Sequence, residues 1–189
     1  MQTQNNIMNI FYFSSDPRQC AEWHIDKHVV KMIVEYAQLM STAHRVLDGT
    51  EYAGKTRLDR KIKRWLLPDS RENTLYKASH IKHPSGIWLR QSNNNYNWLY
   101  ALFCELANEY QYRYGRVHKT YDELKNVLRN PPNNIEVGYL TQPTPAMPDE
   151  YKISADSREC YKAYYRGAKR SFAKWTKREV PDWFEKEIA

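Results

Sequence analysis

The stretch DPRQCAEWHIDKHVVKMIVEYAQLMSTAHRVL, residues 16–47, decides the fold. Asp16 before Pro17 is typical of a helix start, and Asp48 before Gly49 is typical of a helix end. At about 100° per residue, a narrow polar stripe runs along an otherwise apolar cylinder. Surface helices carry one apolar face and a broad polar face, so this reversed pattern predicts a long central helix. The stripe holds His24, His28, Lys31, Glu35, Gln38 and Thr42, with Lys27 and Arg45 beside it.

The overall charge favours an anionic partner. The chain has 189 residues, which suffices for one domain with a hydrophobic core. Its 29 Lys and Arg exceed its 22 Asp and Glu, so the net charge is +7. Fifteen Tyr and six Trp supply rings that stack on bases as well as build cores. We therefore expect DNA or a nucleotide as the partner, with a merely basic protein as the alternative.

Cysteine usage and hydropathy predict a cytoplasmic protein. Cys20, Cys104 and Cys160 are isolated and odd in number, which indicates a reducing compartment. The sequence has no apolar run of about 18 residues, so it predicts no membrane span and no membrane partner. Residues 1–13 lack the cationic segment and apolar run of a signal peptide.

The remaining pattern predicts a mainly α fold, a single compact helical domain over residues 1–189 around the long N-terminal helix. A long irregular loop at 130–148, rich in Pro and Asn, precedes the C-terminal helix. Residues 50–79 carry many charges and form either a short helix or a basic loop, an insertion in the helical domain. The other expected elements are an extended run at 9–13, helices at 83–114, 121–128 and 156–175, and a short turn or helix that begins at 181–183.

The string HIDKHVVKM holds the first set of candidate functional residues. His24 and His28 have the i, i+4 spacing of zinc-binding helices, but the ammonium groups of Lys27 and Lys31 oppose a cation. We therefore expect no metal ion and no cofactor. The pattern favours anion binding or acid–base chemistry by the histidines. The alternative is a set of polar groups that bridge to neighbouring helices.

Glu35 lies two turns further along the same stripe. It is either a member of a buried ion pair or a catalytic carboxylate. In glycosyl-bond cleavage, a carboxylate stabilises the cationic sugar or activates water.

Two further segments are candidates for phosphate or nucleic-acid binding. In KASHIKHPSGIW, His80 and His83 precede a helix whose free N–H groups favour phosphate. Asn94, in a run of three Asn, is suited to reading a base edge. The alternative for this segment is a capping turn between helices.

The segment YQYRYGRVHK interleaves basic and aromatic residues, which suits a phosphate backbone with stacked bases. Its candidates for phosphate binding are Arg113, Arg116 and Lys119, with a solvated helix end as the alternative. In the C-terminal helix, by contrast, we expect the aromatic residues to pack in the core and the cations to face solvent.

Several strings resemble a family of small proteins encoded by tailed phages, over most of the chain. They are NIFYFSSDPRQCAEWHIDKHVVKMIVEYAQLMSTAHRVL, HPSGIWLRQSNNNYNWL, AMPDEYK and YKAYYRGAK. This resemblance implies a protein that acts in the cytoplasm of the phage's host cell, and it implies no particular activity.

More remotely, the order of features is similar to phage endonuclease V type pyrimidine-dimer DNA glycosylases. Those enzymes are small, basic and all-α, with a short extended segment, a helix that carries catalytic residues, and an aromatic, basic C-terminus. They use a free N-terminal amine and a helix glutamate. Here the extended segment begins near Asn9, and Lys27 and His28 occupy the neighbourhood of that glutamate. The resemblance therefore assigns no catalytic residue.

The sequence leads to three hypotheses. The first is a DNA- or nucleotide-acting hydrolase that cleaves the N-glycosidic bond of a damaged or modified base, in DNA repair. Glu35 supplies the carboxylate, His24 or His28 acts on the leaving base or the water, and Lys27 and Lys31 hold phosphate or one of them is an amine nucleophile. The second is a non-catalytic protein that sequesters a host signalling nucleotide, and the third is a DNA-binding accessory protein. The approach to the site would be lined by His80, His83, Arg113 and Arg116.

Overall fold

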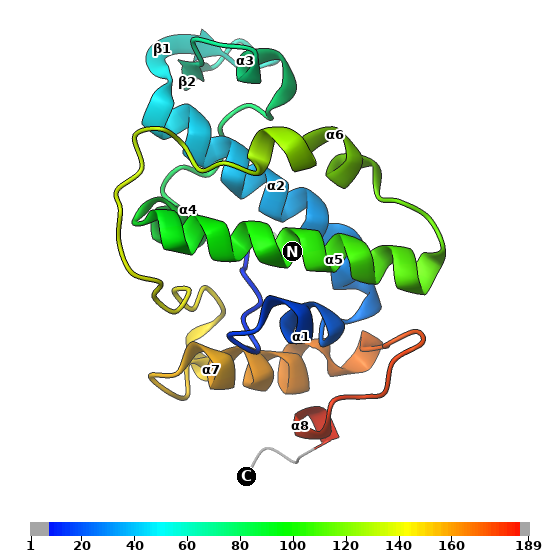
Figure 1. Ribbon diagram of the computed structural model, residues 1–189. Coiled ribbons are helices and arrows are strands. Elements are labelled where there is room, and N and C mark those ends of the chain that lie inside the picture. Colours follow the sequence, from blue (N-terminus) through cyan, green and yellow to red (C-terminus); the bar gives the residue numbers. More distant parts are fainter. Residues whose placement is uncertain (1–7, 186–189) are drawn as a thin grey trace.

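The computed structural model describes residues 8–185, which form eight α-helices and one two-stranded sheet (Figure 1). The predicted mainly α class is confirmed. The part of the signal-peptide prediction that concerns residues 1–7 lies outside the described residues. None of the helices within residues 8–185 has the length and hydropathy that crossing a bilayer requires.

The single helix predicted over residues 16–47 is wrong, because it is broken into α1 (Pro17–Glu22) and α2 (Asp26–Asp48). Asp16 caps α1 as expected, since its Oδ1 accepts a hydrogen bond of 3.0 Å from the amide of Arg18. The break lies at residues 23–25, where Ile25 is extended at φ −65° and ψ 156°. Because of this break, the polar stripe of α2 begins after His24.

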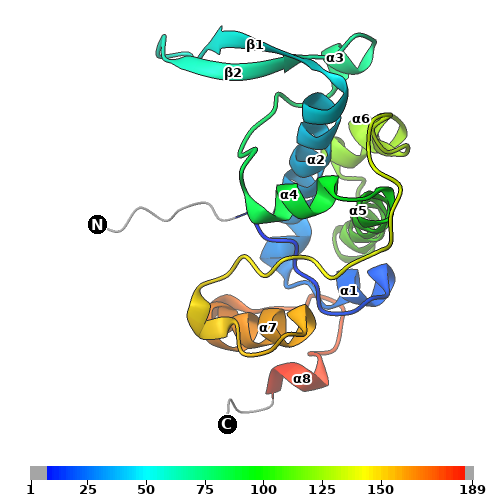
Figure 2. The ribbon, with the colours of Figure 1, turned by 90° about the vertical axis from the view of Figure 1, so that its left-hand side faces the viewer.

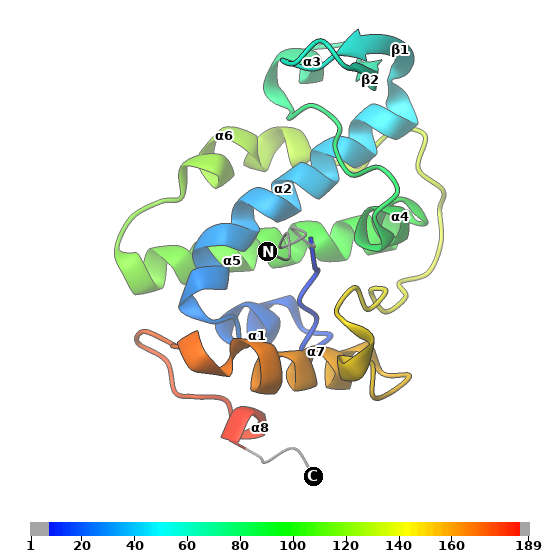
Figure 3. The ribbon, with the colours of Figure 1, turned by 180° about the vertical axis from the view of Figure 1, so that it is seen from behind.

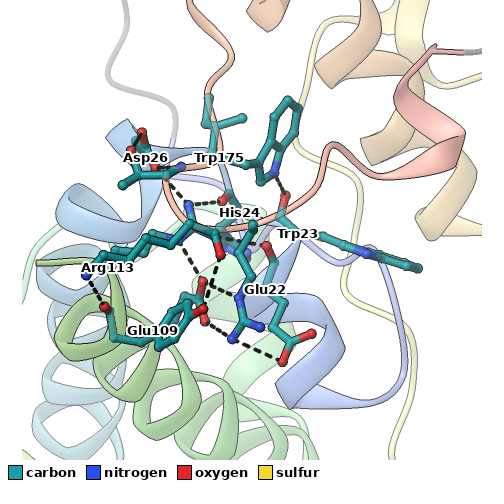
Figure 4. A network of polar contacts seen from close by, with 12 residues as sticks. Glu22, Trp23, His24, Asp26, Glu109, Arg113 and Trp175 are labelled. Carbon is teal, nitrogen blue, oxygen red and sulfur yellow. Dashed lines mark hydrogen bonds and ion pairs between the residues drawn. The ribbon is translucent and has the colours of Figure 1, made fainter.

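Two side chains from distant segments stabilise the break. A helix end leaves carbonyls without intrahelical partners. Arg113 donates to the carbonyls of Glu22 and His24, both at 2.9 Å, and the indole N–H of Trp175 donates to the carbonyl of Trp23 at 3.0 Å (Figure 4). Three successive carbonyls at the corner are therefore paired by side chains.

The inner side of α2 packs against α4 (Pro84–Arg90), α5 (Asn93–Tyr114) and α6 (Lys119–Leu128). Its outer side faces away from α5, where Figure 3 shows α2 in front. The fully buried side chains on α2 include Val29, Ile33, Tyr36, Ala37 and Met40, and the exposed ones are Lys27, Val30, Lys31 and Val34.

The helical region predicted at 83–114 is divided between α4 and α5. Ser92 begins the second helix, because its Oγ accepts a hydrogen bond of 3.1 Å from the amide of Asn95. Gly115 ends it at φ 70°, a left-handed conformation that favours glycine, as the sequence predicts. The helix predicted at 121–128 begins two residues earlier, at Lys119.

The prediction of a short helix or a basic loop for residues 50–79 is wrong over residues 50–66, which form a β-hairpin. β1 (Thr50–Lys55) and β2 (Lys61–Leu66) form an antiparallel hairpin, and the short helix α3 (Arg71–Thr74) follows. The hairpin projects from the C-terminal end of α2 (Figures 1 and 2). The charge-rich composition concealed the strands, because most of their residues are exposed and bury no apolar face.

Arg45, from the predicted stripe, attaches the hairpin base to α2. Its guanidinium is fully buried and donates to the carbonyls of Trp65 at 3.0 Å, Leu75 at 2.9 Å and Tyr76 at 2.6 Å. It also forms an ion pair of 2.5 Å with Glu72. Arg45 is therefore a structural residue in this fold.

The C-terminal helix predicted at 156–175 is wrong after residue 164. α7 (Ser157–Tyr164) continues as a π-helical turn, η2 (Tyr165–Lys169), and a 3-10 turn, η3 (Arg170–Phe172). An irregular segment as expected at 130–148 precedes the 3-10 turn η1 (Asp149–Tyr151) and α7, and the chain reaches α8 (Asp182–Glu185) at the end. In Figure 2, α7 and the hairpin extend to the same side of α2, opposite to α5.

Candidate functional site

Five charged or titratable side chains gather where the first turns of α2 meet η2. We call them the lysine–histidine cluster. Lys169 comes from η2, and both Lys169 and the α2 lysines lie near enough to His28 to affect its pKa. The members of the cluster are Lys27, His28, Lys31 and Lys169, together with Glu35, which joins them through its ion pair of 2.8 Å with Lys31.

His28 is the buried member of the cluster, at 7% exposure. Its Nδ1 lies 2.6 Å from the hydroxyl oxygen of Tyr165, and its ring stacks on Phe11 at a centroid distance of 4.2 Å. Burial lowers the pKa of His28 well below its ordinary value, and the positive charges around it lower it further. The imidazole is therefore neutral at neutral pH, and no residue in the described range hydrogen-bonds to Nε2.

Lys27 and Lys169 are held by aromatic rings and by no carboxylate among residues 8–185. The Nζ of Lys27 lies 4.3 Å from the centroid of Phe172, and that of Lys169 lies 4.6 Å from the centroid of Tyr164. Cation–π contacts orient an ammonium group without neutralising its charge. Both amines are therefore suited to hold an anion.

Glu35 is held by only one of its two carboxylate oxygens. Oε1 forms an ion pair of 2.8 Å with Lys31, while Oε2 is buried and has no hydrogen-bond partner in the described part of the chain. A buried carboxylate oxygen without a partner is costly. The unmet hydrogen-bonding capacity of this buried oxygen makes Glu35 a candidate functional residue.

The π-helical turn directs Tyr165 and Lys169 toward α2. Such turns are rare and occur frequently at functional sites. Gly167 permits a close approach within this turn, because a Cβ there would lie 2.5 Å from the ring of Tyr151. The ring of Tyr151 in turn packs against Tyr164 at a centroid distance of 5.1 Å. The irregular segment before α7 thus supports one side of the cluster.

His24 was a candidate catalytic residue, and the structure places it close enough to His28 to affect the pKa of that residue, but inside the core. It is fully buried, with Nδ1 at 2.7 Å from the carbonyl oxygen of Cys20 and Nε2 at 3.0 Å from the hydroxyl of Tyr36. Because the helix breaks at residues 23–25, His24 and His28 do not share a helix face. Both ring nitrogens of His24 are used in hydrogen bonds within the core. Because the side chain has no exposed surface, it cannot contact a substrate.

Arg113 was predicted to bind phosphate, and this prediction is wrong, because the side chain is 0% exposed. Figure 4 shows it among carbonyls and carboxylates of the α1–α2 corner. It forms ion pairs with Glu109 at 2.6 Å and Asp26 at 2.9 Å. Arg178 joins the network through Glu109 at 2.8 Å.

Arg116 and Lys119 are exposed, as a phosphate-binding role requires, but they lie at the turn between α5 and α6. The Nε of Arg116 donates to the hydroxyl of Tyr110 at 2.9 Å, and Lys119 lies 3.7 Å from Glu123. None of their contacts within residues 8–185 involves the lysine–histidine cluster.

The three candidates near α4 have mostly structural roles. His83 caps α4, because its Nδ1 accepts a hydrogen bond of 3.2 Å from the amide of Ser85. Asn94 donates to the carbonyl of Gly138 at 2.6 Å and so anchors the irregular segment rather than facing an open groove. His80 is exposed at φ 50°, and its ring has no hydrogen bond or ion pair within residues 8–185.

Sequence reasoning missed the C-terminal part of the site. The prediction that the aromatic residues of this segment pack in the core is confirmed, since Tyr165 is fully buried, but the sequence did not predict that Tyr165 and Lys169 lie beside His28. The alternation of cations and aromatic rings in this segment was the available signal. The π-helical turn that directs them toward α2 has no simple pattern in the sequence.

Within residues 8–185, no three or more His, Cys, Asp or Glu side chains are grouped as metal ligands. No family model, no curated protein and no solved structure matches the chain. The phage-protein and glycosylase resemblances therefore remain predictions, and the function is argued from the site alone.

Proposed function

We propose that the protein acts on DNA or a nucleotide and cleaves the N-glycosidic bond of a damaged or modified base. The observation that carries this proposal is the carboxylate of Glu35. One of its oxygens is fixed by Lys31 at 2.8 Å, and the other is buried without a partner among the described residues. A fixed carboxylate beside cationic and neutral groups is suited to stabilise the positive charge of a sugar in the transition state.

In this reaction, Lys27 and Lys169 hold phosphate groups by charge-assisted hydrogen bonds. The bond between C1′ and the base nitrogen breaks, and its electron pair goes to the base. Glu35 stabilises the cationic sugar and takes a proton from the water that adds at C1′. This proton then passes to the nitrogen of the released base, which restores the carboxylate. His28 is neutral and offers Nε2 for a hydrogen bond with the base or the water. A base inside a duplex must first leave the stack to reach these groups.

The experiment is a turnover panel read by mass spectrometry. It contains plain, ultraviolet-irradiated and modified-base DNA oligonucleotides together with free mononucleotides and cyclic nucleotides. We expect a released base from at least one substrate, and Glu35→Gln reduces its rate by about 100-fold or more while the protein stays folded. The matched control is Glu159→Gln, because Glu159 forms a similar helical ion pair with Lys162 at 2.9 Å.

Two outcomes contradict the assignment. If Glu35→Gln retains full turnover, the carboxylate has no chemical role. If Glu35→Gln unfolds the protein, Glu35 is a structural residue. The control variant separates both outcomes from a general effect of removing one negative charge.

A second function is favoured by the ion pair itself. Because Lys31 already neutralises part of Glu35, the cluster has an excess of ammonium groups suited to grip phosphates without chemistry. A non-catalytic protein that sequesters a signalling nucleotide would use the same residues. Tight retention of an intact mononucleotide or cyclic nucleotide in the same panel, with no released base, supports this second function.

A further inference from the structure

The β1–β2 hairpin carries much of the positive charge of the protein. Residues 50–66 contain six Lys and Arg and only two acids, a net charge of +4 out of +7 for the whole chain. Most of its side chains are exposed on both faces. A strand pair that buries little apolar surface contributes little to the stability of the domain, so stability alone does not account for this projecting element.

Most of the hairpin cations lack an acidic partner. Lys55 pairs with Asp59 at 2.7 Å, and Lys63 pairs with Glu51 at 2.8 Å. The other cations, for which residues 8–185 provide no ion pair, are Arg57, Arg60, Lys61 and Arg64.

The register places like charges opposite each other. Lys55 is the direct cross-strand partner of Lys61. Like charges at directly opposite positions destabilise a strand pair. The Lys55–Lys61 pair therefore lowers the local stability of the hairpin and concentrates positive charge near its tip.

The tip of the hairpin is ordered by Thr56. Its amide donates to the carbonyl of Arg60 at 2.8 Å, and its Oγ1 accepts from the amides of Leu58 at 3.3 Å and Arg60 at 3.1 Å. Leu58 at the tip is 75% exposed. Arg57 and Arg60 therefore flank an apolar side chain at the far end of a shaped turn.

The base of the hairpin is fixed to the helical body. Trp65 is buried at 8% exposure, its carbonyl accepts from Arg45, and Arg64 donates to the carbonyl of Ala78 at 3.3 Å. The hairpin therefore has a fixed attachment to the helical body at its base.

We propose that this hairpin inserts into the major groove of B-form duplex DNA. A two-stranded ribbon fits a major groove about 12 Å wide, whereas the minor groove is only about 6 Å wide. Arg57, Arg60 and Lys61, which have no acidic partner among residues 8–185, face the phosphates on either side of the groove. The inference rests on the proposed function and makes duplex DNA, rather than a free nucleotide, the substrate class of the lysine–histidine cluster.

The arrangement of the elements allows one duplex to reach both regions. The hairpin and α7 extend to the same side of α2 (Figure 2). From Lys31 to Gly49, α2 rises about 27 Å at 1.5 Å per residue. At about 3.4 Å per base pair, this corresponds to about eight base pairs of DNA. His80 and Lys82 are exposed in the segment that follows the hairpin and add positive charge between the two regions.

The test compares the double variant Arg57→Gln/Arg60→Gln with the control Lys125→Gln/Arg129→Gln. The control removes the same charge from α6 and the residue after it, on the other side of the molecule in Figure 2. The measurement is the affinity for a 20-base-pair DNA duplex over a range of salt concentrations. We expect the hairpin variant to bind at least about tenfold more weakly, with a salt slope smaller by about 1.8, and the control to change neither.

Two further measurements identify the groove and the duplex form. The wild-type protein should protect guanine N7, which lies in the major groove, from methylation. It should bind an RNA duplex of the same length much more weakly, because the major groove of A-form RNA is too narrow for the hairpin. Equal binding of the RNA duplex or no N7 protection would overturn groove insertion.

The outcomes separate the two proposals. If the hairpin variant loses DNA binding but no panel substrate releases a base, the hairpin inference stands and the glycosidic function fails. If a base is released only from a free nucleotide and the duplex is not bound, the function stands and the hairpin inference fails. Equal weakening in the hairpin variant and the α6 control also overturns it.

Discussion

Arg113 shows how a single residue sets the geometry of the site. Its buried guanidinium pairs with Asp26 and Glu109 and donates to two carbonyls of the α1–α2 corner. The corner fixes where α2 begins, and Lys27 and His28 lie in its first turn. Arg113, which was predicted to bind phosphate, therefore acts indirectly, because it fixes the start of the helix that carries Lys27 and His28.

We expect Arg113→Gln to lower the free energy of unfolding by about 3–5 kcal/mol, because it removes one of the two cations from the buried Glu109 and leaves the carbonyls of Glu22 and His24 without their donor. Urea denaturation measures this change. The control is Arg18→Gln, because Arg18 is 73% exposed and its ion pair with Glu22 is superficial. The control should lose less than about 1 kcal/mol. Equal losses in both variants would contradict a structural role specific to Arg113.

The protonation of His28 is a second property of a single residue. Burial is the main cause of its lowered pKa, and Lys169 contributes less. We expect Lys169→Gln to raise the pKa of His28, which nevertheless stays below about 6.5. Side-chain nuclear magnetic resonance over pH measures the value directly, with Lys125→Gln as the control. A pKa of His28 at or above the ordinary histidine value in the wild type would contradict a neutral imidazole in the cluster.

At the scale of elements, the hairpin combines positive charge with a lower local stability. We expect Lys61→Glu to replace the Lys55–Lys61 repulsion by an attractive cross-strand pair, which adds about 0.2–1 kcal/mol locally. Hydrogen exchange of the hairpin amides should then slow by up to about fivefold. The same variant should bind duplex DNA more weakly, since it removes positive charge from the hairpin. Faster exchange, or tighter DNA binding, would contradict the account.

The elements also separate what local sequence determines from what it does not. Asp16, Ser92 and Gly115 act through their own neighbours, and the helix ends that depend on caps of this kind follow from the sequence. The break at residues 23–25 depends on Arg113 and Trp175, about 90 and 150 residues away in the chain. Periodicity cannot detect such partners, because the apolar pattern continues through the break.

The same limit applies to the candidate site. Lys27, His28, Lys31 and Glu35 lie within three turns of α2, so helical spacing alone brings them together. Lys169 joins them only through the packing of η2 against α2, which no local pattern indicates. Two predicted site residues have structural roles instead. His24 is buried at the helix break, and Arg113 binds the carbonyls of that break.

At the scale of the whole molecule, buried histidines make stability depend on pH. Burial lowers the pKa of His24 and of His44 to about 4, while an unfolded histidine titrates near 6.5. As pH falls below about 6.5, these histidines bind protons in the unfolded chain but stay neutral in the folded chain. The free energy of unfolding therefore decreases until about pH 4. Each histidine costs about 2 kcal/mol by pH 5.

Denaturation in urea from pH 7 to pH 5 measures this loss. Glu72 does not titrate between pH 7 and pH 5. Burial raises its pKa, but contacts with Lys77 and Arg45 outweigh this effect and hold the pKa at about 2. Its contribution is present above the ordinary carboxyl range and is lost only at lower pH. An unfolding free energy that stays constant from pH 7 to pH 5 would contradict the neutral buried histidines.

The central claim is that the lysine–histidine cluster is where DNA or a nucleotide binds. The most direct test is ultraviolet crosslinking of the wild-type protein to a DNA duplex and to a free nucleotide, with the crosslinked peptides identified by mass spectrometry. We predict crosslinks within residues 27–35 and 164–172. Crosslinks confined to other surfaces, such as the hollow of about 350 Å³ lined by Arg18, Glu22 and Arg178, would contradict the claim.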